Sequence, residues 1–235
     1  MAEMIGLTNN VTLEWMELAA NCKLLGKDVT EAKGILDENI SLTIMSKDNI
    51  RKKRDIVLNM WYRPDDWFLS ASVKAADGLL PNERIAIHWA LLMKRYQVFY
   101  DLCFVIGSLF DYRDEITLTQ IRNRIFEKWG ARNTLLNSLS KNLQTFKELE
   151  SIKSVPPAGT YQKGNILINH IQVVQLLCLA VIEQSGKQYM TWEEVIHHPT
   201  LFPFDIKDVT QADMASSEYL CLERMGDGIV IRARD

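Results

Sequence analysis

Residues 117–164 constrain the fold of this chain more than any other segment. They read as one helix, a short turn at Gly130, a second helix over residues 133–149 and a hairpin around Pro156 and Gly159. Helix, turn, helix and hairpin in this order are typical of a winged helix-turn-helix. The sequence therefore predicts such a unit in the middle of the chain.

The second helix of this segment is unusually polar, because charged and amide or hydroxyl side chains interrupt all but a thin apolar line. We expect such a helix to gain little from burial, and its donors and acceptors suit base edges and phosphates. Its first turns would reach bases, its later lysines and those of the hairpin would lie near phosphates, and the hairpin tyrosine would pack against the sugar backbone. The predicted DNA contacts of this unit are Arg132, Asn133, Thr134, Asn137, Lys141, Lys153, Tyr161 and Lys163. A solvated helix face with a surface hairpin is the alternative.

A second basic segment lies nearer the N-terminus. Residues 46–55, SKDNIRKKRD, carry five basic and two acidic residues, a net charge of +3. Ser46 is a good N-cap and Pro64 ends the helix, which would be the second helix of another helix-turn-helix. The predicted phosphate contacts here are Lys47, Asn49, Arg51, Lys52 and Arg54. An ordinary solvated helix is again the alternative.

The C-terminal part of the chain repeats the same kind of pattern. Helices are expected at residues 172–185, 191–198 and about 207–216, followed by a hairpin at Gly226–Gly228. Together they would form a second winged-helix-like unit. We therefore divide the chain into an N-terminal helical region (1–80), a central winged-helix region (81–165) and a C-terminal helix and hairpin region (166–235).

Composition and charge agree with a mainly α protein. Glycine and proline are scarce, at 11 and 6 residues, which favours helices over a sandwich or barrel. The net charge is only −3, but positive charge is concentrated in the two segments above, between an acidic N-terminal stretch and an acidic C-terminal stretch. Local patches of this kind can bind phosphate in an acidic protein.

The sequence has no pattern typical of an enzyme, a metal site or a membrane protein. The four cysteines form no CxxC pair, which indicates free thiols in a reducing cytoplasm. His197 and His198 lack further ligands at metal-binding spacing, and phosphate-binding or nucleophile-elbow glycine motifs are missing. The apolar segments Tyr96–Tyr112 and Ile166–Ile182 are interrupted by polar residues and indicate buried helices. We expect a cytoplasmic protein without cofactor.

Two segments resemble a known family. Residues 37–61, DENISLTIMSKDNIRKKRDIVLNMW, place an asparagine before a Ser/Thr-rich link and a basic helix, and residues 87–121 place a basic-aromatic pair before an aromatic helix. The matching positions in the first segment are Asn39, Thr43, Ser46, Arg51, Lys53 and Arg54. Over residues 28–185 the chain resembles the BrxA-type small helical protein of bacterial BREX phage-resistance systems.

The resemblance implies a function, and the residues leave alternatives to it. It implies a non-enzymatic component that binds double-stranded DNA in an antiphage system, beside a methyltransferase and other large protein subunits. The acidic ends favour instead a protein-interaction scaffold or adaptor, whose winged helices dock a larger partner. A winged-helix transcriptional regulator is the third possibility.

Overall fold

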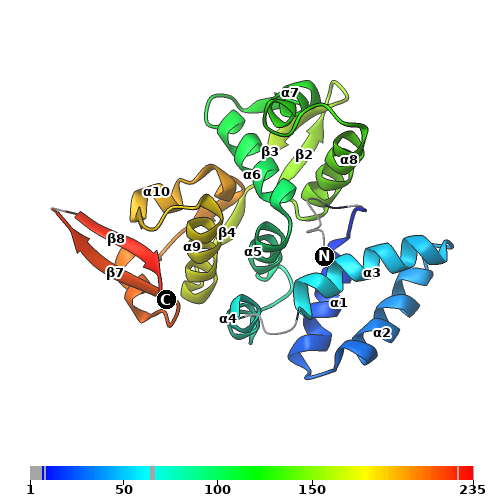
Figure 1. Ribbon diagram of the computed structural model, residues 1–235, viewed down its shortest axis with the longest axis horizontal. Helices are drawn as coiled ribbons and strands as arrows, with labels where there is room; N and C mark the ends of the chain where they lie inside the picture. The colour runs from blue at the N-terminus through cyan, green and yellow to red at the C-terminus, as the bar shows by residue number, and fades with distance from the viewer. Residues whose placement is uncertain (1–6, 8, 64–66, 227, 235) are drawn as a thin grey trace.

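The computed structural model describes Leu7 and residues 9–63, 67–226 and 228–234 (Figure 1). The helices are α1 (Leu13–Leu24), α2 (Val29–Ser41), α3 (Lys47–Trp61), α4 (Trp67–Ala76), α5 (Ile85–Arg95), α6 (Gln97–Phe110), α7 (Leu118–Trp129), α8 (Asn133–Glu148), α9 (Ile171–Ser185) and α10 (Trp192–Ile196), with 3-10 helices η1 (Pro199–Leu201) and η2 (Gln211–Ser216). The strands are β1 (Glu115–Thr117), β2 (Ile152–Val155), β3 (Thr160–Lys163), β4 (Ile166–Ile168), β5 (Met190–Thr191), β6 (Phe204–Ile206), β7 (Leu220–Met225) and β8 (Gly228–Ala233). The prediction of a mainly helical protein with a C-terminal β-hairpin is confirmed.

Helices α1, α2 and α3 pack on one another at one end of the molecule (Figure 1). Helix α3 begins after Ser46, as predicted, and the Ser46 hydroxyl accepts the amide N–H of Asn49 at 3.4 Å. Its second half turns apolar side chains inward, and Trp61 is fully buried. The basic first half is therefore the part of α3 that reaches solvent.

Helices α5 and α9 form the centre of the core, side by side between the other elements (Figure 1). Every residue of α5 from Ile85 to Met93 is buried. Trp89 meets Phe99, Phe146 and Phe202 edge-on, with ring centroids 5.2 to 5.5 Å apart. Aromatic rings from several elements thus pack together at the centre of the molecule.

The segment from β1 to β3 forms one continuous unit above this core (Figure 1). Its strands pair antiparallel in the order β1-β3-β2, and α7 and α8 lie between β1 and β2 in the sequence. Thr117 and Gln120 form a capping box at the start of α7, and the Leu118 amide donates to the Gly159 carbonyl at 2.7 Å. The hairpin end is thereby fixed to the start of α7.

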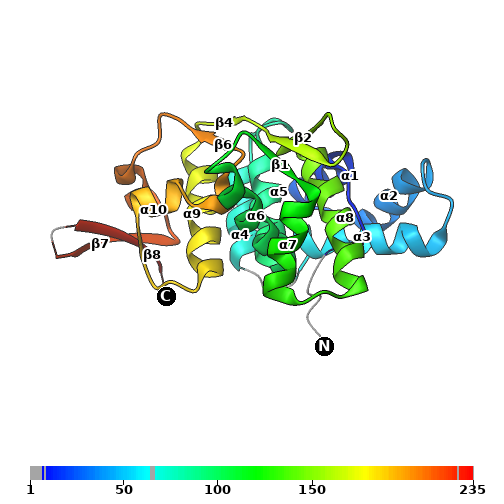
Figure 2. The ribbon, with the colours of Figure 1, turned by 90° about the horizontal axis from the view of Figure 1, so that it is seen from above.

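The C-terminal part carries another three-stranded sheet, in the order β5-β8-β7. The hairpin β7–β8 is present as predicted and projects away from the body (Figure 2). Two expectations are wrong in detail. The segment expected as helix at about 207–216 is a 3-10 helix over Gln211–Ser216, and Ile166–Ile168 is a strand that pairs in parallel with Phe204–Ile206.

No helix among the described residues is long and apolar enough to cross a lipid bilayer.

Candidate nucleic-acid interface

Helix α8 is anchored to the core through one apolar face. Leu135, Leu139, Leu143 and Phe146 on this face are all at least nine-tenths buried. The Phe146 ring stacks on Phe99 with centroids 4.8 Å apart and planes 9° apart. This contact holds the C-terminal half of α8 on the core.

Part of the polar character of α8 is used inside the protein. Asn142 and Thr145 are fully buried. The Asn142 amide donates to the Ser138 carbonyl at 2.7 Å, and the Thr145 hydroxyl accepts the backbone N–H of Val11 at 3.3 Å. The expectation that α8 gains little from burial is therefore wrong for this side, because the N-terminal segment covers it and bonds to Thr145, while the buried Asn142 Oδ1 has no partner among the described residues.

The start of α8 presents a different set of side chains. Arg132, Asn133, Thr134 and Asn137 are exposed, and none of them has a side-chain partner among the residues that the structure describes. Arg132 is the N-cap and forms no side-chain cap, so the first amide N–H groups of α8 are open to solvent. An uncapped helix N-terminus attracts anions. We call these four residues, with the half-buried Lys141, the α8 surface.

Strand register separates the predicted contacts of the hairpin. Residues directly opposite in an antiparallel pair share a face. Tyr161 is paired with Ile116 and Ser154, and it is buried on the side that packs on the helices. Lys153 is paired with Gln162 and lies on the other face of the sheet. The structure therefore does not bring Lys153 to the α8 surface. Tyr161 is buried against the helices and is not part of that surface either.

Lys163 lies at the far end of α8 from Arg132. It is exposed and pairs with Ile152, the first residue of β2, which follows α8 closely in the chain. A 16-residue helix is about 24 Å long. Lys163 is therefore separated from the base-reading positions by the length of α8.

A groove with a volume of about 220 Å³ runs beside α8. It is lined by Leu118 and Arg122 of α7, by Leu136, Ser140, Gln144 and Lys147 among the residues of α8, and by Tyr161. Arg122 and Lys147 are exposed, and among the described residues no carboxylate lines the groove. Arg122 was not among the sequence-predicted contacts, because only the packing of α7 on α8 places it beside the polar helix.

The basic segment of α3 divides into exposed and buried cations. Lys47, Asn49, Arg51 and Lys52 are exposed. Arg51 and Lys52 both bind the Asp48 carboxylate, at 2.7 and 2.6 Å. One carboxylate thus faces two cations, and Lys47 adds a third positive charge. We call Lys47, Asn49, Arg51 and Lys52 the α3 surface.

Arg54 does not belong to this surface. It is only 8% exposed, and its guanidinium binds Asp37 at 2.8 Å and Asp55 at 2.7 Å. Burial lowers the pKa of Arg54, but the hydrogen bonds and charges of these two carboxylates raise it overall. Arg54 therefore ties α3 to α2, and its charge is balanced by these two carboxylates.

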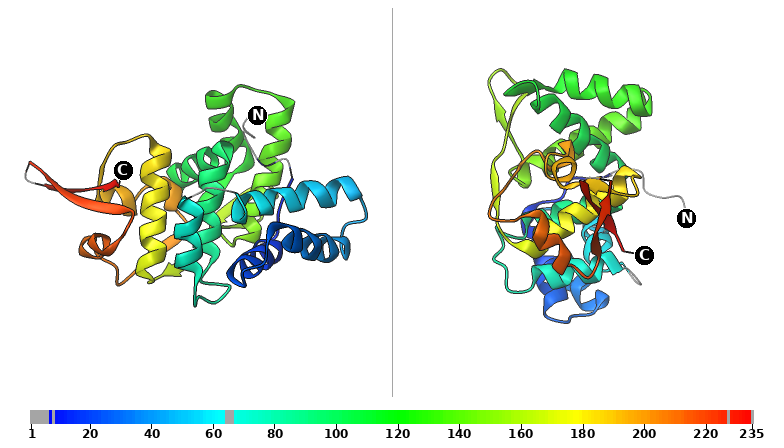
Figure 3. Two further views of the ribbon diagram at one scale, coloured as in Figure 1. Left: turned by 60° about the horizontal axis from the view of Figure 1, so that its bottom comes forward. Right: turned by 90° about the vertical axis from the view of Figure 1, so that its left-hand side faces the viewer.

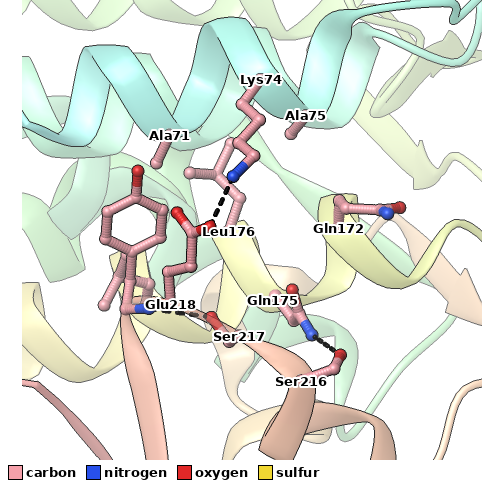
Figure 4. Close-up of a pocket in the computed structure, with 11 residues that line it drawn as sticks. Ala71, Lys74, Ala75, Gln172, Gln175, Leu176, Ser216, Ser217 and Glu218 are labelled. Carbon is pink, nitrogen blue, oxygen red and sulfur yellow. Dashed lines mark hydrogen bonds and ion pairs between the residues drawn. The ribbon is translucent and has the colours of Figure 1, made fainter.

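A second hollow, with a volume of about 270 Å³, lies between α4, α9 and the segment before β7 (Figure 4). Lys74 and Glu218 form an ion pair across its mouth at 2.6 Å, and Gln175 donates to the Ser216 hydroxyl at 2.9 Å. Its one cation is paired with its one carboxylate. The hollow is thus neutral and holds none of the predicted contacts.

The described residues hold no cluster of three or more His, Cys, Asp or Glu side chains that could bind a metal ion. His198 is partly buried, and burial lowers its pKa to about 4. His88 is fully buried and binds Glu17 and Trp61. These histidines are engaged in packing within the fold.

Comparison with protein-family models, with curated proteins and with solved structures finds no match to this chain.

Proposed function

We propose that the unit from β1 to β3 is a winged helix that binds double-stranded DNA through the α8 surface, with the α3 surface as a second contact. The observation that carries this proposal is the exposed, unpaired set Arg132, Asn133, Thr134 and Asn137 at an uncapped helix start. The order of elements and the strand order β1-β3-β2 support it, because they give α8 the place of a recognition helix.

The side chains of the α8 surface suit base edges in the major groove. Arginine can pair with guanine through two hydrogen bonds, and asparagine can pair with adenine in the same way. Arg132 and Asn137 are separated by five residues, so they lie more than one turn apart along α8. They would therefore meet different base pairs, while the amide groups at the helix start bind a phosphate.

We further propose that the protein serves as a non-enzymatic component of a BREX-like antiphage system. The support is the resemblance of residues 37–61 and 87–121 to the BrxA-type protein. Arg51, one of the matching positions, is exposed on α3. A component of this kind needs moderate affinity, because larger subunits would supply the chemistry. Deletion of the gene from a host that carries such a system should restore phage plating; unchanged protection would refute this role.

Binding to a labelled duplex at about 50 and about 200 mM salt tests the DNA proposal. We expect binding at low salt and a steep loss at high salt, because each neutralised phosphate releases condensed counterions. The variant Arg132→Ala/Asn137→Ala/Lys141→Ala should weaken binding strongly. The control Lys33→Ala/Lys207→Ala removes two cations elsewhere and should change little. An α8 variant as tight as the wild type would contradict the proposal.

A protein-interaction adaptor is the second candidate, and the projecting hairpin β7–β8 favours it. Met225 and Ile229 near its end are about half exposed, at 50% and 48%. Residues 183–235, which include this hairpin, carry ten acidic and five basic residues, a net charge of −5. An apolar tip on an acidic unit suits a basic protein partner better than DNA. Two results would favour this function. The absorbance ratio at 260 and 280 nm would show that the purified protein carries no nucleic acid, and the protein would bind no duplex at low salt.

A further inference from the structure

The groove beside α8 has walls that the rest of the fold fixes in place. Leu139 and Leu143 on its α8 side are buried, so the floor of the groove is continuous with the core. The Leu118 amide at the start of α7 donates to the Gly159 carbonyl at 2.7 Å, and Phe146 near the end of α8 is fully buried. Both helices are therefore anchored, and a partner would meet a groove that is already formed.

Two further leucines leave apolar surface in contact with water along this groove. Leu118 of α7 is 39% exposed, Leu136 of α8 is 40% exposed, and both line the groove. A hydrated phosphate removes little of this surface from water, whereas an apolar side chain of another protein removes more. The volume of about 220 Å³ is also below the roughly 300–1,000 Å³ of small-molecule pockets. The groove therefore suits protein side chains better than nucleic acid or a cofactor.

The groove also carries two positive charges that the described part of the protein does not neutralise. Arg122 of α7 and Lys147 of α8 are exposed there, and neither forms an ion pair with a described residue. Glu148, which follows Lys147 in the chain, accepts a hydrogen bond from Gln144 at 3.2 Å. Carboxylates on a partner would be the electrostatic complement of these two cations.

The groove follows α8 for about three turns, since Leu136 and Lys147 are separated by about 16 Å along the helix. A groove between two helices, with apolar and charged positions along it, suits an amphipathic helix. Asn137 of the α8 surface follows Leu136 and lies about 100° further round the helix. Lys141 has the same relation to Ser140. The groove and the α8 surface are therefore neighbouring but different faces of α8.

We propose that this groove binds an acidic amphipathic helix of a partner protein. Apolar side chains of that helix would contact Leu118 and Leu136, and its carboxylates would pair with Arg122 and Lys147. Helices α7 and α8 lie at the top of Figure 1, apart from the projecting hairpin β7–β8, so this docking site is distinct from the hairpin tip. The proposal does not rest on DNA binding, and the two can be tested separately.

Three labelled peptides of about 18 residues, long enough to form a helix, provide the probes. The acidic peptide has leucines at i, i+3, i+4 and i+7 and glutamates at the flanking positions. The second peptide has lysine in place of each glutamate, and the third has the acidic composition in scrambled order. In fluorescence anisotropy titrations with the full chain, we expect a Kd below about 100 μM for the acidic peptide and at least roughly tenfold weaker binding of the other two.

Variants of the groove test which groups hold the peptide. Arg122→Glu/Lys147→Glu should weaken binding of the acidic peptide roughly tenfold and strengthen binding of the lysine peptide, a gain that a misfolded protein would not show. Leu136→Ser should weaken binding of the acidic peptide severalfold, because apolar contact is lost. The control Lys33→Glu/Lys153→Glu makes the same change of charge at exposed positions elsewhere and should alter binding by less than about twofold.

An acidic peptide that binds no better than the scrambled one would overturn the proposal. Equal binding of the acidic peptide by the wild type and by Arg122→Glu/Lys147→Glu would also overturn it. If the wild type binds no peptide and this variant loses duplex binding, the groove belongs to the DNA surface instead. A wild type that binds the acidic peptide but no duplex would uphold the docking site and refute the proposed DNA binding.

Discussion

Loss of the Glu17 carboxylate should destabilise the fold more than loss of any surface charge. Glu17 of α1 is 8% exposed and accepts hydrogen bonds from Arg84 at 2.5 and 3.0 Å and from His88 at 2.6 Å. Arg84 and His88 are themselves 5% and 0% exposed. The cluster joins α1 to α5, and it encloses one carboxylate and one guanidinium away from water.

The hydrogen bonds also define the proton positions in this cluster. The indole N–H of Trp61 donates to Nδ1 of His88 at 3.3 Å, so Nδ1 carries a lone pair. Nε2 then carries the proton and donates to Glu17. A neutral His88 is therefore fully satisfied, and the negative charge of Glu17 is balanced by Arg84. Burial raises the pKa of Glu17, but the hydrogen bonds and charges of His88 and Arg84 lower it overall.

Substitution of Glu17 by alanine leaves the Arg84 charge buried without a counter-ion. Breaking a buried ion pair in this way typically costs roughly 3–5 kcal/mol. For a chain of this size each 1 kcal/mol lowers the melting temperature by about 2–4 °C. We therefore expect Glu17→Ala to lower it by roughly 6–20 °C, and to lower the free energy of unfolding in a urea titration by the same 3–5 kcal/mol.

Two further variants decide whether this reasoning holds. Glu14→Ala removes an exposed carboxylate from the same helix and should change the free energy of unfolding by about 0.5 kcal/mol at most. The double variant Glu17→Leu/Arg84→Met removes both charges and should recover much of the loss, since apolar side chains can replace a buried pair. A Glu17→Ala protein within about 1 kcal/mol of the wild type would show that the cluster is not a desolvated ion pair.

Three further outcomes follow from other buried groups. Burial lowers the pKa of His198 to about 4, so below pH 6.5 only the unfolded state takes up this proton, which should remove about 1 kcal/mol of stability between pH 6.5 and 5.5 in urea titrations. Burial also lowers the pKa of His88 despite the opposing charge of Glu17, so stability should fall further over this range, and His88→Gln should reduce the pH dependence. Gly107→Ala should destabilise by about 1–3 kcal/mol because its Cβ would overlap a carbonyl of η1, whereas Gly34→Ala, in open space on α2, should stabilise by about 0.5–1 kcal/mol. Burial raises the pKa of the Cys22, Cys103 and Cys178 thiols, whereas Cys221 is only partly buried. A thiol reagent should therefore modify only Cys221 rapidly in the native protein.

Features specified by neighbouring residues could be predicted from the sequence. The N-cap Ser46 is present where the sequence indicated it. The hairpin around Gly226 also forms as expected. In each case the partner groups lie within a few residues, so the local pattern contains the whole interaction.

Features that depend on distant segments could not be predicted in this way. The polar residues Asn142 and Thr145 look like a solvent face in the sequence, but Leu7 and Val11, more than 130 positions away, bond to this side of α8. The outward position of Lys153 depends on the register of β2 against β3, which a shift of one residue would reverse. The charge of Arg54 is neutralised partly by Asp37 on another helix. A list of basic residues therefore overestimates the surface that is free to bind phosphate.

The arrangement of charge makes DNA binding and protein docking compatible. The hairpin β7–β8, within the acidic residues 183–235, and the helices α2 and α3 lie at opposite ends of the molecule (Figure 3). The negative charge of the hairpin end is repelled by a polyanion, so this end would lie away from a duplex that contacts the α3 and α8 surfaces. That end would then remain in solvent, where its apolar hairpin tip can contact a basic partner without competing with DNA. On this argument, raising the salt concentration should slow association with DNA through loss of this orientation, whereas substitution of Met225 or Ile229 by serine should leave the rate unchanged.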